Sequence, residues 1–174
     1  MIKIVRANYS FNFTYDVVDR QTLISIPNGT TGEYSHDNYG RLATVANKNG
    51  AAILSKFDYV YNNVNNITQI TENQTEIHSY TNDLLGQLTG AIHTNSILPT
   101  ETYSYDSVMN RTSSAISSSY NYNAGDRLLE DDQFTYIYDD NGNMTSKTEK
   151  SSSQITTCTY DSLNQLIRID FPNS

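Results

Sequence analysis

Eight copies of one seven-residue motif recur along this chain of 174 residues, and no other feature constrains its fold as strongly. We call the repeat the turn motif and number its positions one to seven. Successive copies start 16 to 25 residues apart, which fits one β-hairpin and a return loop with strands of about five or six residues. The sequence therefore predicts a tandem array of β-hairpins. The motifs begin at Tyr15, His36, Tyr61, Asn82, Tyr105, Tyr122, Tyr138 and Tyr160.

Two positions of the turn motif predict the chain reversal. Position two is always Asp or Asn, whose side-chain oxygen can accept a hydrogen bond from the backbone two residues later. Position five is Gly, Asn or Asp in seven copies, the types that best tolerate a left-handed backbone, and Met109 alone departs from the rule. This combination is typical of a type I turn followed by a bulge between antiparallel strands. Position two is Asp16, Asp37, Asn62, Asp83, Asp106, Asn123, Asp139 and Asp161, and position five is Asp19, Gly40, Asn65, Gly86, Met109, Asp126, Gly142 and Asn164.

The residues around each turn favour strands. Tyrosines alternate with other residues before several turns, as at Tyr59/Tyr61 and Tyr136/Tyr138, so both rings of a pair share one strand face. The 14 Tyr and 5 Phe, with only 17% charged residues, suit half-buried pleated surfaces. No convincing segment has the helical period. The expected fold class is all-β, built from tandem antiparallel β-hairpin repeats.

The residue type at position six is also restricted. Every residue found there has a side chain that can donate a hydrogen bond. We expect these side chains to form a ladder that pairs with the Asp/Asn column across the turn or with neighbouring carbonyls. The column is Arg20, Arg41, Asn66, Gln87, Asn110, Arg127, Asn143 and Gln165.

Charge and hydropathy exclude several classes of partner. The net charge is −8 and the basic residues are scattered, so no basic stripe could follow a phosphate backbone, and we expect no nucleic-acid binding. No stretch approaches the roughly 18 apolar residues of a membrane-spanning helix, and the first residues have no signal-peptide apolar run. The single cysteine cannot form an internal disulfide.

The residues that could be catalytic or could bind a metal ion have simpler structural interpretations. Cys158 alternates with threonines in an expected strand, where a buried small hydrophobe is favoured over a nucleophile. The histidines His36, His78 and His93 lack metal-ligand spacing. The segment 139–143 (DDNGN) is similar to a calcium loop, but its glycine is early and no bidentate Glu follows, so a turn is favoured. The acidic run 130–132 is expected to be solvated.

The motifs resemble those of the YD-repeat, or Rhs-repeat, proteins: bacterial Rhs and polymorphic toxins, the C components of insecticidal toxin complexes, and teneurins. The clearest copies are HDNYGRL, with Asp37, Gly40, Arg41 and Leu42, and YIYDDNGNMTSKT, from Tyr136, and the match runs from about Tyr15 to Leu166. The resemblance implies a spiralling sheet or β-solenoid-like shell segment, which encloses a toxin domain in the bacterial members. The family's segment after the repeats, with an ARYYDP-like stretch and self-cleaving aspartates, is absent, so no autoproteolysis or toxicity is expected by that route.

We therefore expect a lead-in over residues 1–14 and a single array of about eight hairpins over residues 15–174, as part of a longer protein. The expected function is a structural segment of a secreted or cell-surface shell, whose partners are other segments of the same protein, further copies pairing at sheet edges, or an enclosed toxin domain. The alternative is a glycan- or choline-binding adhesion module, similar to cell-wall repeats with aromatic hairpins, although Trp, the best residue for stacking on choline, is absent. We expect no enzymatic activity, no cofactor, and no catalytic or metal-binding residues.

Overall fold

A computed structural model describes residues 2–6 and 9–172, and its described residues form strands, turns and loops without a helix. The expected all-β class is confirmed. Since no helix occurs in these ranges, none could span a membrane. The strands are β1 (Ile2–Arg6), β2 (Tyr9–Tyr15), β3 (Gln21–Ser25), β4 (Thr30–His36), β5 (Leu42–Asn49), β6 (Ala52–Tyr61), β7 (Ile67–Glu72), β8 (Glu76–Asn82), β9 (Leu88–His93), β10 (Glu101–Thr102), β11 (Ser104–Tyr105), β12 (Arg111–Ser113), β13 (Tyr120–Tyr122), β14 (Leu128–Asp131), β15 (Phe134–Tyr138), β16 (Met144–Glu149), β17 (Ile155–Tyr160) and β18 (Leu166–Asp170).

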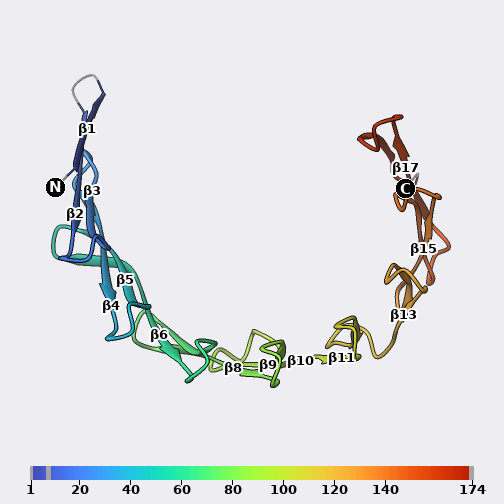
Figure 1. Cartoon of the computed structure of the whole chain (residues 1–174), viewed down its shortest axis with the longest axis horizontal. Helices are drawn as coiled ribbons and strands as arrows, with labels where there is room; N and C mark the ends of the chain where they lie inside the picture. The colour runs from blue at the N-terminus through green and yellow to red at the C-terminus, as the bar shows by residue number, and fades with distance from the viewer. Residues whose placement is uncertain (1, 7–8, 173–174) are drawn as a thin grey trace. The chain divides into compact units, whose positions relative to one another are not determined.

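The chain divides into two compact units, residues 1–100 and residues 101–174. In the first unit, β1 to β9 lie side by side in chain order, each antiparallel to the next. In the second unit, β11 pairs with β12, and β13 to β18 form an antiparallel sheet, also in chain order. Figure 1 shows these successive hairpins within each unit. The predicted lead-in over residues 1–14 contains β1 and most of β2.

All eight turn motifs form the predicted reversal. Position five has a positive φ in every copy, from 57° at Asp126 to 89° at Gly142, and Met109 adopts 71° although it lacks the favoured chemistry. A one-residue register shift accompanies each turn: Tyr15 faces Gln21, whereas Thr14 faces Leu23. The same shift occurs at the other seven turns. The type I turn with a bulge is therefore confirmed throughout the array.

The sheets enclose very little hydrophobic core. Among the residues with described burial, the buried apolar side chains are Ala46 and Ala91, which are 5% and 2% exposed, and many larger apolar side chains remain exposed. In β7 and β16 every residue is half-buried. Because each hairpin packs mainly against its neighbours in the sheet, its stability depends on contacts between successive repeats rather than on a shared interior.

Candidate functional site

The side chain at position two organises each turn. In the first copy, Asp16 Oδ1 accepts hydrogen bonds from the backbone amides of Val18 and Arg20, both at 3.0 Å. The bond from the position-six amide recurs in all eight motifs, at 2.8 to 3.1 Å. The backbone closes the same loop, since Asp16 N donates to Arg20 O and Asp19 N to Asp16 O. A short side chain with one fixed acceptor thus holds the turn, as position two of the sequence predicts.

These hydrogen bonds favour the ionised form of three position-two carboxyls, those of Asp16, Asp37 and Asp139. The amide of Arg20 lowers the pKa of Asp16 below its usual value, with support from the Arg20 guanidinium. Burial alone would raise the pKa of Asp37, but hydrogen bonds from the Arg41 side chain and backbone outweigh it and the pKa is lowered. The Asn143 side chain lowers the pKa of Asp139 in the same way. The turns are therefore built around carboxylates rather than carboxylic acids.

The predicted donor ladder is present, and its first rung lies within one turn. In four motifs the position-six side chain donates to the second carboxylate oxygen at position two of the same motif. The bonds are Arg20 Nε to Asp16 Oδ2 (2.6 Å), Arg41 Nε to Asp37 Oδ2 (2.7 Å), Asn110 Nδ2 to Asp106 Oδ2 (3.3 Å) and Asn143 Nδ2 to Asp139 Oδ2 (2.9 Å).

The second rung joins consecutive turns, because the same position-six side chain reaches position five of the next motif. Where position five is Asn or Asp, its side-chain oxygen accepts the bond. These bonds are Arg41 Nη1 to Asn65 Oδ1 (2.9 Å), Asn110 Nδ2 to Asp126 Oδ1 (2.8 Å) and Asn143 Nδ2 to Asn164 Oδ1 (2.9 Å). We call the two sets of rungs together the turn ladder.

Where position five is glycine, the preceding position-six side chain lies against it. A Cβ added to Gly40 would lie 3.4 Å from Arg20 Nη1, and one added to Gly142 would lie 3.5 Å from Arg127 Nη1. A Cβ on Gly86 would lie 3.6 Å from Asn66 Nδ2. Glycine therefore serves the positive φ, and the donor of the preceding turn lies within van der Waals distance of where a Cβ would be.

Tyrosine hydroxyls at position one add a third link between repeats. Three of them donate to the backbone carbonyl of position seven in the preceding motif, beside the point where the returning strand begins. The bonds are Tyr61 Oη to Leu42 O (2.8 Å), Tyr122 Oη to Arg111 O (3.0 Å) and Tyr160 Oη to Met144 O (3.1 Å). Burial is the main cause of the raised pKa at Tyr61, Tyr122 and Tyr160, so these phenols remain donors at neutral pH.

Arg41 is the most connected member of the turn ladder. Besides Asp37 and Asn65, its Nη1 donates to Asn62 O (3.1 Å). Its guanidinium carbon lies 4.5 Å from the ring centre of Tyr61 and 5.0 Å from that of Tyr39. A planar group with several donors and a stacking face can make all these contacts at once, which a lysine could not.

The rung within the third motif, which begins at Tyr61, is incomplete. Asn66 Nδ2 is buried without a hydrogen-bond partner. In the equivalent turns, Asn110 and Asn143 donate to a carboxylate oxygen, but position two of this motif is Asn62, whose Oδ1 already accepts two backbone amides. The second terminal atom of Asn62 is an amide nitrogen, which cannot accept a hydrogen bond. The missing acceptor explains the unpaired donor.

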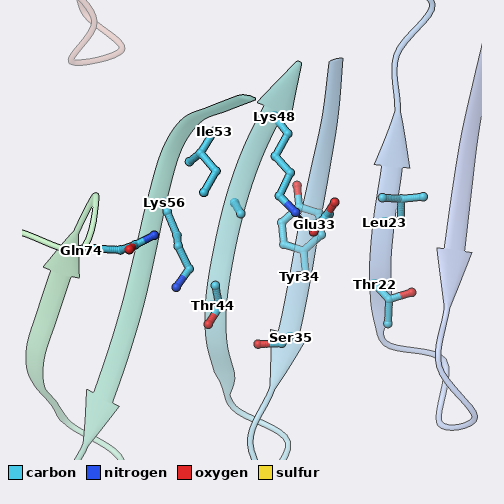
Figure 2. Close-up of a pocket in the computed structure, with 11 residues that line it drawn as sticks. Thr22, Leu23, Glu33, Tyr34, Ser35, Thr44, Lys48, Ile53, Lys56 and Gln74 are labelled. Carbon is cyan, nitrogen blue, oxygen red and sulfur yellow. Dashed lines mark hydrogen bonds and ion pairs between the residues drawn. The ribbon is translucent and has the colours of Figure 1, made fainter. Parts of the chain in front are cut away.

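A groove lies over β3 to β6 in the first unit, with a volume of about 490 Å³. In Figure 2, Lys48 and Glu33 approach each other over it, at 2.5 Å between Nζ and Oε2. Lys56 Nζ binds Asp58 Oδ2 at 2.7 Å. The charged side chains are thus paired and the remaining lining is neutral. The other lining residues are Thr22, Leu23, Tyr34, Ser35, Thr44, Ala46, Ile53 and Gln74.

One sequence expectation about a side-chain environment is wrong. Cys158 was expected to be buried, but it is half-buried in β17, where it faces Ile169 of β18, because no second layer is packed over this sheet. The acidic run 130–132 was expected to be solvated, and Glu130 and Asp132 are exposed while Asp131 is half-buried. Each of the three carboxylates also has a partner. Glu130 binds Lys150 Nζ (2.6 Å), Asp131 accepts from Tyr136 Oη (2.9 Å), and Asp132 accepts from Ser118 N (2.6 Å). Burial and the Asp131 bond raise the pKa of Tyr136, and the Ser118 amide and hydroxyl lower the pKa of Asp132.

The structure also shows where segment 139–143 and the three histidines lie. The segment 139–143 forms a turn, with both Asp139 oxygens accepting from Asn143. His36 occupies position one and faces Leu42. His78 and His93 are different, because their Nδ1 atoms lie 2.7 Å apart and His78 approaches two glutamates. Spacing along the chain does not reveal this cluster, because its members lie on three strands and meet only through the sheet register.

Comparisons with known proteins agree with this geometry. The family model described as teneurin YD-shell matches residues 63–174. A Photorhabdus luminescens Tc holotoxin pore with a substitution in TccC3 is 18% identical over 88% of this chain, with a TM-score of 0.51. The crystal structure of TcdB2-TccC3 is 13% identical over 95% of it, with a TM-score of 0.58. This chain covers 12% of the length of each of those chains. No curated protein matched the chain at a significant level.

Proposed function

This chain belongs to the teneurin YD-shell family, and we propose that it forms one segment of the β-sheet wall of a larger secreted or cell-surface protein, a wall that encloses a toxin domain or another cargo. The observation that carries the proposal is the turn ladder. It joins successive turns in both units through hydrogen bonds donated by Arg41, Asn110 and Asn143, so the array can extend by adding repeats and needs no closed interior.

The fold shared with two solved structures supports the wall segment. Both are Tc toxin assemblies that contain TccC3, and this chain corresponds to about an eighth of the chain it matches in each. We assign this segment a structural role in the wall rather than a catalytic role. No catalytic step is part of the proposal, and the residues described in the ladder are engaged in holding turns together.

The edge strand β18 indicates how the segment would join its neighbours. It pairs with β17 on one side only, at the end of its sheet. Its apolar residues Leu166, Ile167 and Ile169 are exposed, and Phe171 follows directly after the strand. An apolar edge with unpaired backbone groups is a template for another strand. The proposal assigns that place to a further repeat of the parent protein, or to another copy when the segment is alone.

Light scattering on the purified chain tests the proposal. We expect a mass above the 19.6 kDa of one chain, and we expect the double variant Ile167→Lys/Ile169→Lys to lower it towards one chain because charges on an edge strand oppose pairing. Leu163→Lys is the control, since Leu163 is even more exposed than Ile167 and Ile169 but lies in the last turn rather than on the edge. A wild-type chain that stays monomeric at high concentration would count against edge pairing.

The groove over β3 to β6 favours a second candidate, the binding of a glycan or a choline-like group. Its volume is within the range of small-ligand sites, and Tyr34 offers one aromatic face. Calorimetric titration with choline and with short glycans tests this candidate. Binding that is lost in Tyr34→Ala would support it, and the absence of heat with every ligand would leave the wall segment as the function of this chain.

A further inference from the structure

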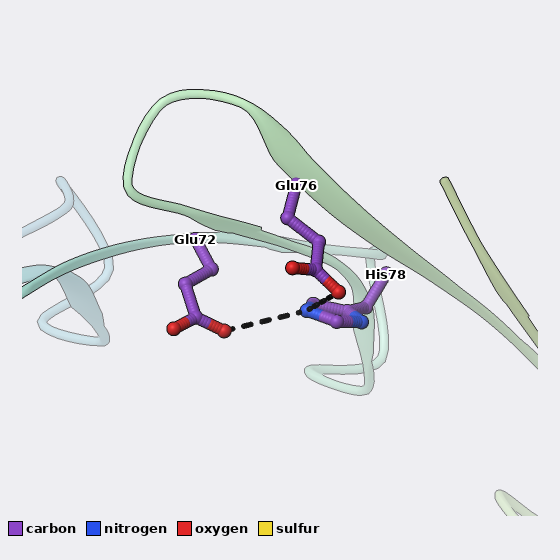
Figure 3. A group of neighbouring side chains, drawn as sticks. All are labelled: Glu72, Glu76 and His78. Atoms are coloured by element: carbon purple, nitrogen blue, oxygen red, sulfur yellow. Dashed lines mark ion pairs between the residues drawn. The ribbon is translucent and has the colours of Figure 1, made fainter. Parts of the chain in front are cut away.

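Two glutamates and two histidines gather on one face of the first unit. Glu72 ends β7, Glu76 and His78 lie in β8, and His93 ends β9. Glu72 is directly opposite Glu76, and His78 directly opposite His93, in the antiparallel register. Because residues two apart share a strand face, all four side chains lie on the same side of the sheet. Figure 3 shows the carboxylates of Glu72 and Glu76 both approaching Nε2 of His78.

The distances within this cluster fit a shared cation better than direct hydrogen bonds. His78 Nε2 lies 3.7 Å from Glu72 Oε2 and 3.8 Å from Glu76 Oε1, too long for hydrogen bonds. One ligand atom from each of the three residues lies within 4.8 Å of the others. Ligands bound to one Zn²⁺ at about 2.1 Å in tetrahedral geometry are about 3.4 Å apart. Small rotations of the two half-exposed glutamates would bring the three atoms to that separation.

His93 supplies the support that a metal-binding histidine needs. The Nδ1 atoms of His78 and His93 are 2.7 Å apart, so one of them carries the proton and the other accepts it. When His78 Nδ1 donates, Nε2 of the same ring is unprotonated, and its lone pair faces the two carboxylates. Metal-binding histidines commonly donate their second ring nitrogen to a neighbour in this way, which fixes the tautomer and the ring orientation. The His78 side chain is only 13% exposed, so the ring is also held by its surroundings.

The backbone holds the two glutamates opposite each other. Asn73 and Gln74 have φ values of 49° and 66°, and Thr75 N donates to Glu72 O, which makes a tight reversal. Asn73 also ties this reversal to β6, because Asn73 N donates to Lys56 O (2.8 Å) and Asn73 Oδ1 accepts from Lys56 N (2.9 Å). The like charges of Glu72 and Glu76 repel across the strand pair, which destabilises the hairpin unless a cation lies between them.

We propose that Glu72, Glu76 and His78 form a binding site for a divalent first-row metal ion, with Zn²⁺ as the best match, and that His93 positions His78. One imidazole with two carboxylates suits such an ion, and three protein ligands leave a fourth position for water. The bound ion would connect the ends of β7 and β8 and, through His93, β9. The site would therefore be a metal cross-link between hairpins of the wall, and it shares no residue with the turn ladder.

Titration of the metal-free chain with zinc chloride, followed by calorimetry and thermal unfolding, tests the proposal. All variants carry Cys158→Ser, which removes the thiol as a competing ligand. We expect one equivalent of Zn²⁺ to bind and the melting temperature to rise with zinc concentration. His78→Gln and Glu76→Gln should weaken binding at least tenfold, and His93→Ala about tenfold. His36→Gln, at position one of another turn, should bind as the parent does.

A second readout does not depend on added metal. Without zinc, Glu76→Gln should raise the melting temperature, because it removes the repulsion from Glu72, whereas with saturating zinc it should lower the melting temperature relative to the parent. This reversal of sign is specific to a cation site. The proposal is overturned if zinc does not bind, or if it binds with the same affinity to His78→Gln.

Discussion

Arg41 Nη1 donates to Asn65 Oδ1 at 2.9 Å, and this bond between residues 24 apart in the sequence joins two successive turns. Arg41 also binds Asp37 of its own turn, so one guanidinium fixes a turn and attaches it to the next. The same two-way arrangement recurs with asparagine as donor, at Asn110 and Asn143. In a wall built in this way, contacts between turns stabilise neighbouring repeats, because the described residues bury almost no hydrophobic core that could connect them.

The first prediction concerns the cost of losing this link. Arg41→Ala should lower the free energy of unfolding of the first unit by about 2 kcal/mol, because it removes charged hydrogen bonds to Asn62 and Asn65. Arg20→Ala is the control and should cost less, since Arg20 faces Gly40, which has no side-chain acceptor. Urea unfolding followed by circular dichroism measures both values. Equal losses would show that the bond to the following turn contributes nothing.

The second prediction concerns Met109, which holds a φ of 71° at a position that is glycine in three of the other turns. An L-residue in this conformation costs about 1–2 kcal/mol, and Met109 is 65% exposed, so it has little packing to lose. Met109→Gly should therefore stabilise the second unit by up to about 1 kcal/mol, after the entropy cost of glycine. The neighbouring exposed residue provides a control: Val108→Gly, where φ is not positive, should destabilise it. Thermal unfolding of the two variants should shift in opposite directions.

The third prediction repairs the incomplete rung. Asn62→Asp places a carboxylate oxygen where the unpaired Asn66 Nδ2 can donate to it, as Asn143 donates to Asp139. We expect stabilisation of about 1 kcal/mol. Asn63→Asp adds the same charge one residue later, at an exposed position of the turn, and should have little effect. If both variants behave alike, the added charge rather than the new hydrogen bond would be responsible.

The fourth prediction concerns acid stability. The pKa values of Asp16, Asp37 and Asp139 are lower in the folded chain than in the unfolded chain, so the folded state binds fewer protons. Their stabilising effect should be complete well above the unfolded pKa of about 3.9, and it should be lost as the pH falls through that value and then through the folded pKa values. Melting temperatures measured from pH 7 downwards test this. Asp37→Asn should melt lower than the wild type at pH 7, and the difference should shrink in acid.

The hairpins could be predicted because each turn is specified locally. Position two and position six are four residues apart, and their hydrogen bonds lie within one motif, so the Asp/Asn column and the donor column predict them directly. Met109 shows the strength of this specification, because it adopts the left-handed backbone that the surrounding motif requires.

Contacts between repeats could be predicted only in part. The donor column indicates a ladder, but its partner at position five and the tyrosine bond to position seven depend on how successive hairpins are staggered. The cluster of Glu72, Glu76, His78 and His93 depends on the register of three strands, which spacing along the chain does not reveal. The half-buried Cys158 was mispredicted because strand alternation says which residues share a face, not whether a second layer covers it.

A double-mutant cycle between Arg41 and Asn65 tests the central claim, that the turns of successive hairpins are energetically coupled. Asn65→Gly removes the acceptor while keeping the backbone at φ 69° accessible, and Arg41→Ala removes the donor. We predict that the two changes are not additive, with a coupling of about 1 kcal/mol in urea unfolding. Additive losses, with no coupling beyond experimental error, would contradict the account and leave the sheet hydrogen bonds alone to hold the wall together.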